Sequence, residues 1–208
     1  MDEPRDEIQK KTLRCFKELR EIVQETRQSF DIWKRFACEG EYLCKDAMYH
    51  LTLYNPLFFR TKNAHLQSVF VNLFILGDSD KQSVNCSLLV KLLTEEGNYD
   101  SAGFKQLKRR MERYLRYATS KHCKVARFRH KYYAHRDKNK SMDDLVMLFK
   151  MTIEEVNDTI TAYYRFMECA AVILGEAISS EEEVIKDMEC AMNDAKPFFG
   201  QLPSLQNQ

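Results

Sequence analysis

Apolar residues along the chain recur every three to four positions, which is the spacing that places side chains on one face of an α-helix. The segments with this pattern are 6–28, 30–49, 56–77, 83–93, 101–132, 145–149, 152–178 and 180–197. No stretch alternates between apolar and polar residues with a period of two, so β-strands are not expected. The pattern therefore predicts an all-α protein, an antiparallel helical bundle.

Local signals set several of the helix boundaries. Pro56 suits the first turn of a helix, and Gly77 is expected to end that helix. Ser83 is expected to cap the next helix. Thr152-x-x-Glu155 predicts a capping box, in which the two side chains satisfy backbone N–H groups reciprocally. Similar boxes occur at Ser141-x-x-Asp144 and at Ser180-x-x-Glu183.

The composition indicates one soluble globular domain. We expect residues 1–200 of the 208-residue chain to form it, with 201–208 as a loose C-terminal tail. Six Gly and four Pro are too few for a hairpin-rich all-β fold. The apolar runs 68–76 and 169–174 are far shorter than the ~20 residues that span a membrane. Because no signal peptide is visible either, we expect a cytoplasmic protein without a membrane partner.

The seven cysteines are scattered and form no Cys-x-x-Cys pair. Close-spaced pairs of this kind are typical of zinc sites, so no metal site is expected. We expect reduced and mostly buried thiols, and the sequence suggests no cofactor.

The net charge of +1 conceals an asymmetry between two parts of the chain. Residues 105–140 hold fourteen Lys and Arg against two acids, whereas residues 141–208 hold four against thirteen. Such a division indicates either charge pairing between helices or a binding surface for a polyanion. For residues 105–116 we favour pairing with the acidic C-terminal helices, and the second interpretation stays open.

Candidate chemistry lies in residues 127–137. Arg129 offers a permanent cation that can bind phosphate through two N–H groups, and His135 can exchange a proton near neutral pH. Six residues on an ideal helix correspond to ~9 Å along the axis and roughly 120° around it. The two side chains therefore do not share a face, so either the helix is distorted or a second copy completes the site across a dimer.

The neighbouring residues would suit an RNA ligand. Arg127, Lys131 and His135 are four apart and lie on one line of a helix, where they would attract a phosphate backbone. Tyr132 and Tyr133 could stack on unpaired bases.

This segment resembles the signature of the HEPN superfamily, an Arg, then a polar residue, then four residues and a His on a helix of a bundle. Arg129, His130 and His135 match it position for position, and the ending Tyr133-Ala134-His135-Arg136-Asp137 is similar to abortive-infection HEPN proteins. The resemblance implies an HEPN-like bundle, here with additional N-terminal helices. It also implies a metal-independent endoribonuclease, usually a homodimer with a composite active site.

In that family the positions of Arg129 and His135 are catalytic, and His130 occupies the variable polar position. His135 would act as general base on a ribose 2′-hydroxyl, and Arg129 would stabilise the phosphorane, giving a 2′,3′-cyclic phosphate. Asp137 stands where toxins silenced by a nucleotidyltransferase carry a tyrosine, so the sequence departs from that regulation. Asp137 is either a turn residue or a support for the site. Whether a regulatory partner or an antitoxin binds the protein is left open by the sequence.

Two other functions fit the same sequence. One is a catalytically silent HEPN-like module that binds RNA, a nucleotide or a partner protein. The other is a helical interaction protein with a purely structural role, which the charge asymmetry would also allow.

Overall fold

The computed structural model describes residues 3–37, 56–80, 83–95, 102–134 and 151–179, together with Glu183 and Lys186. The elements within these ranges are all helices, which confirms the all-α fold. The helices are α1 (Glu3–Ala37), α3 (Pro56–Gly77), α4 (Cys86–Glu95), α5 (Ala102–Ser120), α6 (His122–Ala134) and α8 (Ile153–Leu174).

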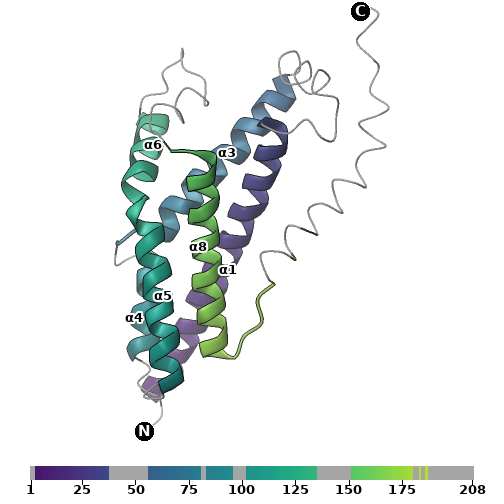
Figure 1. Ribbon diagram of the computed structural model, residues 1–208. Helices are drawn as coiled ribbons and strands as arrows, with labels where there is room; N and C mark the ends of the chain where they lie inside the picture. Colours follow the sequence, from purple (N-terminus) through teal and green to yellow (C-terminus); the bar gives the residue numbers. More distant parts are fainter. Residues whose placement is uncertain are drawn as a thin grey trace, which may run out of the picture.

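The described helices form an antiparallel bundle of four columns (Figure 1). Helices α1 and α8 form one column each, α3 is followed by α4 in a third column, and α5 is followed by α6 in a fourth. Helix α5 packs mainly on α8, and α1 packs mainly on α3. Helix α4 lies beside α1, as α3 does, whereas α6 contacts α3 and α5 contacts α8, so the column of α5 and α6 changes its main neighbour half-way along.

Helix α8 carries the centre of the core. Eleven of its 22 residues are buried, and the remaining face of the helix carries polar residues such as Asp158, Arg165 and Glu168. The largest of its side chains that are less than 2% exposed are Tyr163, Tyr164, Phe166 and Met167. Full burial of one such apolar side chain contributes about 1.5–3 kcal/mol, so α8 contributes strongly to hydrophobic stabilisation.

The predicted break near residue 29 is wrong, because α1 runs unbroken from Glu3 to Ala37. Its polar stretch is buried instead of exposed in a turn. Arg27 donates to Asp31 at 3.0 Å on the same helix and to Asn157 of α8 at 2.8 Å. Because the buried charges of Arg27 and Asp31 bind each other, these residues can lie inside the bundle and the helix continues through them. The rest of the predicted second helix, residues 38–49, lies outside the described residues.

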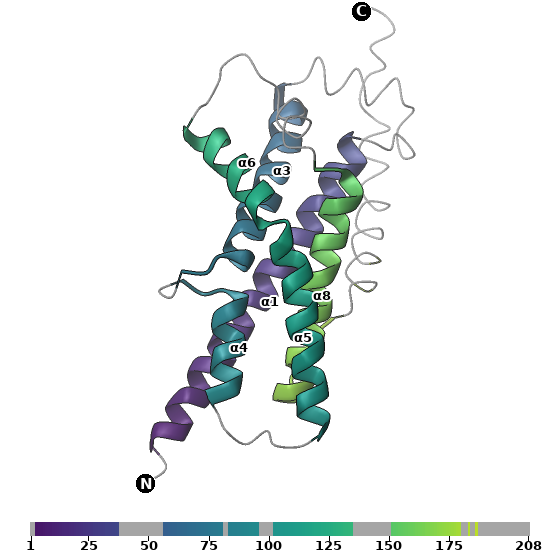
Figure 2. The same cartoon turned by 60° about the vertical axis from the view of Figure 1, so that its left-hand side comes forward.

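The prediction of one uninterrupted basic helix is also wrong. The helix stops at Ser120 and resumes at His122, and the second part leans away from the axis of the first (Figure 2). Thr119 and Ser120 turn their hydroxyls back onto the carbonyls of Leu115 and Tyr117, at 2.8 and 2.6 Å. Hydroxyl groups that bond to the preceding turn compete with the helical hydrogen bonds and bend helices.

The predicted helix ends are confirmed in part. Helix α3 begins and ends as expected, and Thr152 and Glu155 form the full capping box. Helix α8 ends at Leu174 rather than near residue 178, because Gly175 adopts the left-handed conformation with φ of 67°.

Helix α4 begins later than predicted. Asn85 rather than Ser83 caps it, since its Oδ1 accepts from the N–H of Leu88 at 2.8 Å. The predicted helices 145–149 and 180–197, the tail and the boxes at Ser141 and Ser180 lie outside the described residues, apart from Glu183 and Lys186.

The described cysteines are free thiols, of which Cys15, Cys86 and Cys169 are buried and Cys123 is exposed. Burial raises the pKa of the Cys15 thiol to about 11. None of the described helices is both long and apolar enough to cross a bilayer.

Three helices meet at Gly77 with no room for a side chain. A Cβ atom there would lie 2.5 Å from Nδ1 of His122 on α6 and 2.8 Å from the hydroxyl oxygen of Tyr163 on α8. Both distances are shorter than real Cβ atoms show, so either ring would have to move. The absence of a side chain at Gly77 therefore sets how closely α6 and α8 approach α3.

We expect Gly77→Ala to destabilise the fold by about 1–3 kcal/mol, because the added methyl group overpacks a filled junction. Urea unfolding followed by circular dichroism measures the change. Gly103→Ala is the matched control, since nothing lies within 4 Å of a Cβ at this helical position. That control should gain up to about 1 kcal/mol from helix propensity. Equal stability of Gly77→Ala and the native chain would contradict the close packing.

Candidate functional site

The predicted site lies on and beyond the second half of α6. Helix α6 extends to Ala134, so the arginine and the second position of the motif both stand on a helix. Arg127 and Arg129 are exposed. His135 and Asp137 lie outside the described residues, as do the side chains of His130, Lys131, Tyr132 and Tyr133. The proposed pairing of Arg129 with His135 therefore stays a prediction.

The guanidinium of Arg129 stacks on an aromatic ring of a neighbouring helix. Its Cζ atom lies 4.0 Å from the ring centroid of Phe74 on α3. Phe74 is partly buried and packs against the core, so it gives the cation a fixed support. In the described part of the chain no carboxylate pairs with Arg129. Stacking uses the face of the guanidinium and leaves its N–H groups available for an anion.

His122 contacts the same aromatic ring. Its ring centroid is 5.1 Å from that of Phe74, with an interplanar angle of 30°. His122 precedes Arg129 by seven residues, two turns of the helix, so both belong to the face of α6 that packs on α3. Phe74 therefore contacts both the N-terminal end of α6, through His122, and the candidate catalytic arginine, Arg129.

The environment of His122 disfavours its charged form. Burial lowers the pKa of its imidazole, and the nearby carboxylate of Asp78 opposes this effect more weakly. Its Nδ1 atom is buried and has no hydrogen-bond partner among the described residues. The sequence alone suggests a structural role for His122. It does not reveal the contact with the ring on α3, because that helix is distant along the chain.

Two lysines connect the N-terminal end of α6 to the start of α8. The Nζ atom of Lys121 donates to Glu155 Oε1 at 2.8 Å, and that of Lys124 to Oε2 at 2.9 Å. These bonds, the Lys121 contact first, lower the pKa of the Glu155 carboxyl to about 2. Because Glu155 also closes the capping box of α8, one carboxylate fixes two helices.

The remaining basic residues of α5 are mostly not neutralised by α8. Lys108 lies 4.0 Å from Glu112 of its own helix. Arg109, Arg113 and Arg116 are exposed and have no carboxylate partner in the described part of the chain. Pairing between the basic and acidic parts is seen at Lys121 and Lys124, both with Glu155. The predicted pairing of residues 105–116 with the acidic C-terminal helices stays a prediction, because residues 187–208 lie outside the described residues.

The described residues can bind an anion but show no cluster of metal ligands. Across the described ranges, no three His, Cys, Asp or Glu side chains lie close enough to hold one metal ion. Among the described side chains of α6, the exposed guanidinium groups of Arg127 and Arg129 could bind a phosphate.

The fold and the motif define an all-α protein of HEPN type. The model of AbiU2, a HEPN-type abortive-infection family, matches residues 11–187, and the chain therefore belongs to this family. Some HEPN domains are ribonucleases, and others are modules that bind nucleotides. No curated protein and no solved structure matches the chain.

We expect the stability of the protein to fall as the pH drops below about 6.5, the usual pKa of histidine. Below that pH the unfolded chain takes up a proton at His122 that the folded chain resists, so acid favours unfolding. Above about pH 6.5, His122 is neutral in both the folded and the unfolded chain, so this histidine no longer makes the free energy of unfolding depend on pH.

Thermal unfolding at several pH values would measure this effect, with His122→Gln as the comparison. The melting temperature of the native chain should fall more steeply below about pH 6.5 than that of the variant. His65, whose pKa is also lowered by burial, is present in both proteins and cancels in the difference. Parallel curves would show that His122 is not desolvated.

Proposed function

We propose that this protein is a metal-independent endoribonuclease of defence or toxin type, with Arg129 and His135 as its catalytic residues. Membership of an HEPN abortive-infection family supports the reaction class. The stacking of Arg129 on Phe74 is the observation that carries the assignment, because it holds an exposed guanidinium without using its N–H groups. An arginine with only a structural role would more commonly be bound to a carboxylate or a carbonyl.

The reaction follows from the chemistry of the two side chains. Neutral His135 removes the proton of the ribose 2′-hydroxyl, and the 2′-oxygen forms a bond to the adjacent phosphorus. Charge develops on the non-bridging oxygens, where the N–H groups of Arg129 stabilise it. The bond from phosphorus to the 5′-oxygen breaks, and this oxygen takes up a proton. The products are a 2′,3′-cyclic phosphate and a free 5′-hydroxyl.

The substrate would be bound by residues near this pair. Arg127 adds an exposed cation two residues from Arg129, and His130, Lys131, Tyr132 and Tyr133 are the other proposed RNA-binding residues. DNA should resist cleavage because it lacks the 2′-hydroxyl that acts as nucleophile.

We also propose that the active site is shared between two protomers. Residues six apart on an ideal helix are roughly 120° apart around its axis, which prevents Arg129 and His135 from facing one phosphate. A two-fold dimer that pairs the ends of two α6 helices would bring Arg129 of one protomer near His135 of the other.

The purified protein should cut single-stranded RNA in the presence of EDTA, and His135→Ala or Arg129→Ala should lower the rate by at least about 100-fold. Gel analysis of an end-labelled RNA, with phosphatase-resistant cyclic ends as the signature, measures this. His65→Asn is the control for loss of a histidine elsewhere. Cleavage that survives His135→Ala would contradict the assignment, and RNA binding without cleavage would identify a catalytically silent module.

Mixing the two inactive variants tests the shared site. If one site takes Arg129 and His135 from different protomers, a mixed dimer of Arg129→Ala and His135→Ala retains one intact site. Random exchange of subunits should then restore about a quarter of the native activity. Light scattering should show a dimer. A strict monomer, or no recovery after confirmed exchange, would place both groups in one chain.

A further inference from the structure

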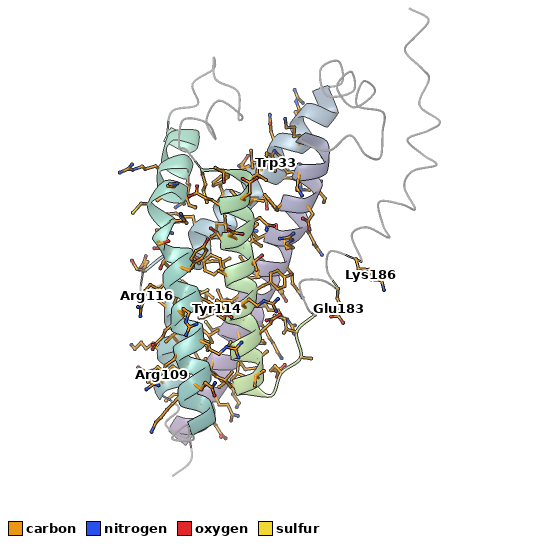
Figure 3. The ribbon with its side chains drawn as sticks, in the orientation of Figure 1. Trp33, Arg109, Tyr114, Arg116, Glu183 and Lys186 are labelled. Carbon is orange, nitrogen blue, oxygen red and sulfur yellow. The ribbon has the colours of Figure 1, made fainter. Side chains whose placement is uncertain are left out.

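The outward face of α5 carries a line of arginines that pair with no carboxylate among the described residues. Exposed arginines on α5 recur every three or four positions, the spacing of one helix face, and Arg127 is a further exposed arginine on α6. We name these exposed residues the arginine stripe: Arg109, Arg113, Arg116 and Arg127. Arg109 and Arg116 lie on the side of α5 that faces away from α8 (Figure 3).

The stripe is not explained by the stability of the bundle. Its four members have no carboxylate partner among the described residues, whereas Lys108, Lys121 and Lys124 each have one. Like charges three or four residues apart on a helix repel and destabilise it by a few tenths of a kcal/mol per pair. The arrangement therefore lowers the stability of α5, and a bound anion would remove this repulsion.

We infer that the arginine stripe binds single-stranded RNA and leads it to the active site. This inference deepens the proposed function, on which it rests. The stripe ends at Arg127, two residues before Arg129, and begins 18 residues earlier at Arg109. That separation corresponds to roughly 27 Å of helix. The RNA backbone would thus contact α5 at a distance from the phosphate that is cut.

An exposed aromatic side chain beside the stripe favours unpaired RNA as the ligand. Tyr117 follows Arg116 directly and is 44% exposed, although it is a large apolar residue. Its hydroxyl donates to Asp158 of α8 at 3.4 Å, which holds the ring at its edge. Proteins that bind single strands combine a basic track with aromatic faces on which bases stack. Guanidinium groups supply the track, since each can bind a phosphate with two N–H groups.

An acidic protein partner fits this surface less well. Stable protein interfaces are centred on buried apolar and aromatic anchors. Apart from Tyr117, Val172 on α8 is the other exposed large hydrophobic side chain among the described residues. The stripe thus offers charge and one ring rather than an apolar centre.

The test compares RNA affinities of full-length variants in a His135→Ala background, where the probe stays intact. The stripe variant carries Arg109→Gln, Arg113→Gln and Arg116→Gln. A matched control removes three exposed charges of α1 through Lys10→Gln, Lys11→Gln and Lys17→Gln. Fluorescence anisotropy uses labelled oligouridylates of about 20 and about 4 nucleotides at several salt concentrations. Circular dichroism checks that each variant is folded.

The stripe variant should bind the longer RNA at least about tenfold more weakly, and its dependence of log K on log salt should be shallower by about 2, as expected for three lost phosphate contacts. Affinity for the shorter RNA and that of the control should change little. Equal losses in the stripe variant and the control would overturn the inference. So would binding of polyglutamate, but not of RNA, through these arginines.

The outcome can be separated from that of the proposed function. If the native chain binds long RNA through the stripe but cleaves none, the nuclease assignment fails and the stripe stands as a binding surface. If the native chain cleaves RNA and the same three arginine substitutions, made with His135 intact, leave cleavage of long and short RNA at native rates, the stripe inference fails alone.

Discussion

The structure depends on one close approach, the junction at Gly77. Helix α3 can meet both α6 and α8 at this point because the residue there has no side chain, and the rings of His122 and Tyr163 fill the space. The resulting position of α6 determines where the candidate site lies. Phe74 lies one turn before Gly77 and supports Arg129, so the packing that closes the core also orients the cation at the surface. Interior packing of this density transmits a displacement rather than absorbing it.

The basic helices divide their charges between two roles. The lysines at the N-terminal end of α6 are bound by Glu155, which belongs to the capping box of α8. The arginines of the outer face stay without acidic partners in the described part of the chain. One part of the positive charge therefore fixes the angle of α6, and the other part remains available to a ligand. A net charge near zero for the whole chain conceals this arrangement, which is why composition alone favours neither charge pairing nor anion binding.

Features that depend on local sequence could be predicted, and those that depend on distant partners could not. Pro56 and the box of Thr152 and Glu155 give correct helix starts, because each acts within a single turn. The polar stretch around Arg27 looks like a break, yet Asn157, 130 positions later, satisfies it inside the bundle. The contact of Arg129 with Phe74 likewise needs α3, and the spacing of residues along α6 does not reveal it. The motif itself could be predicted from the sequence, whereas the support beneath its arginine could not.

The choice between lysine and arginine at each basic position has a consequence for chemical modification. Acetylation neutralises lysine and leaves arginine charged. On this protein, acetylation of Lys121 or Lys124 would break the contacts with Glu155 and loosen the start of α8. The arginines of the outer face would keep their charge under the same treatment. A lysine-directed modification would therefore act on the geometry of the bundle, and it would leave the charge of the arginine stripe unchanged.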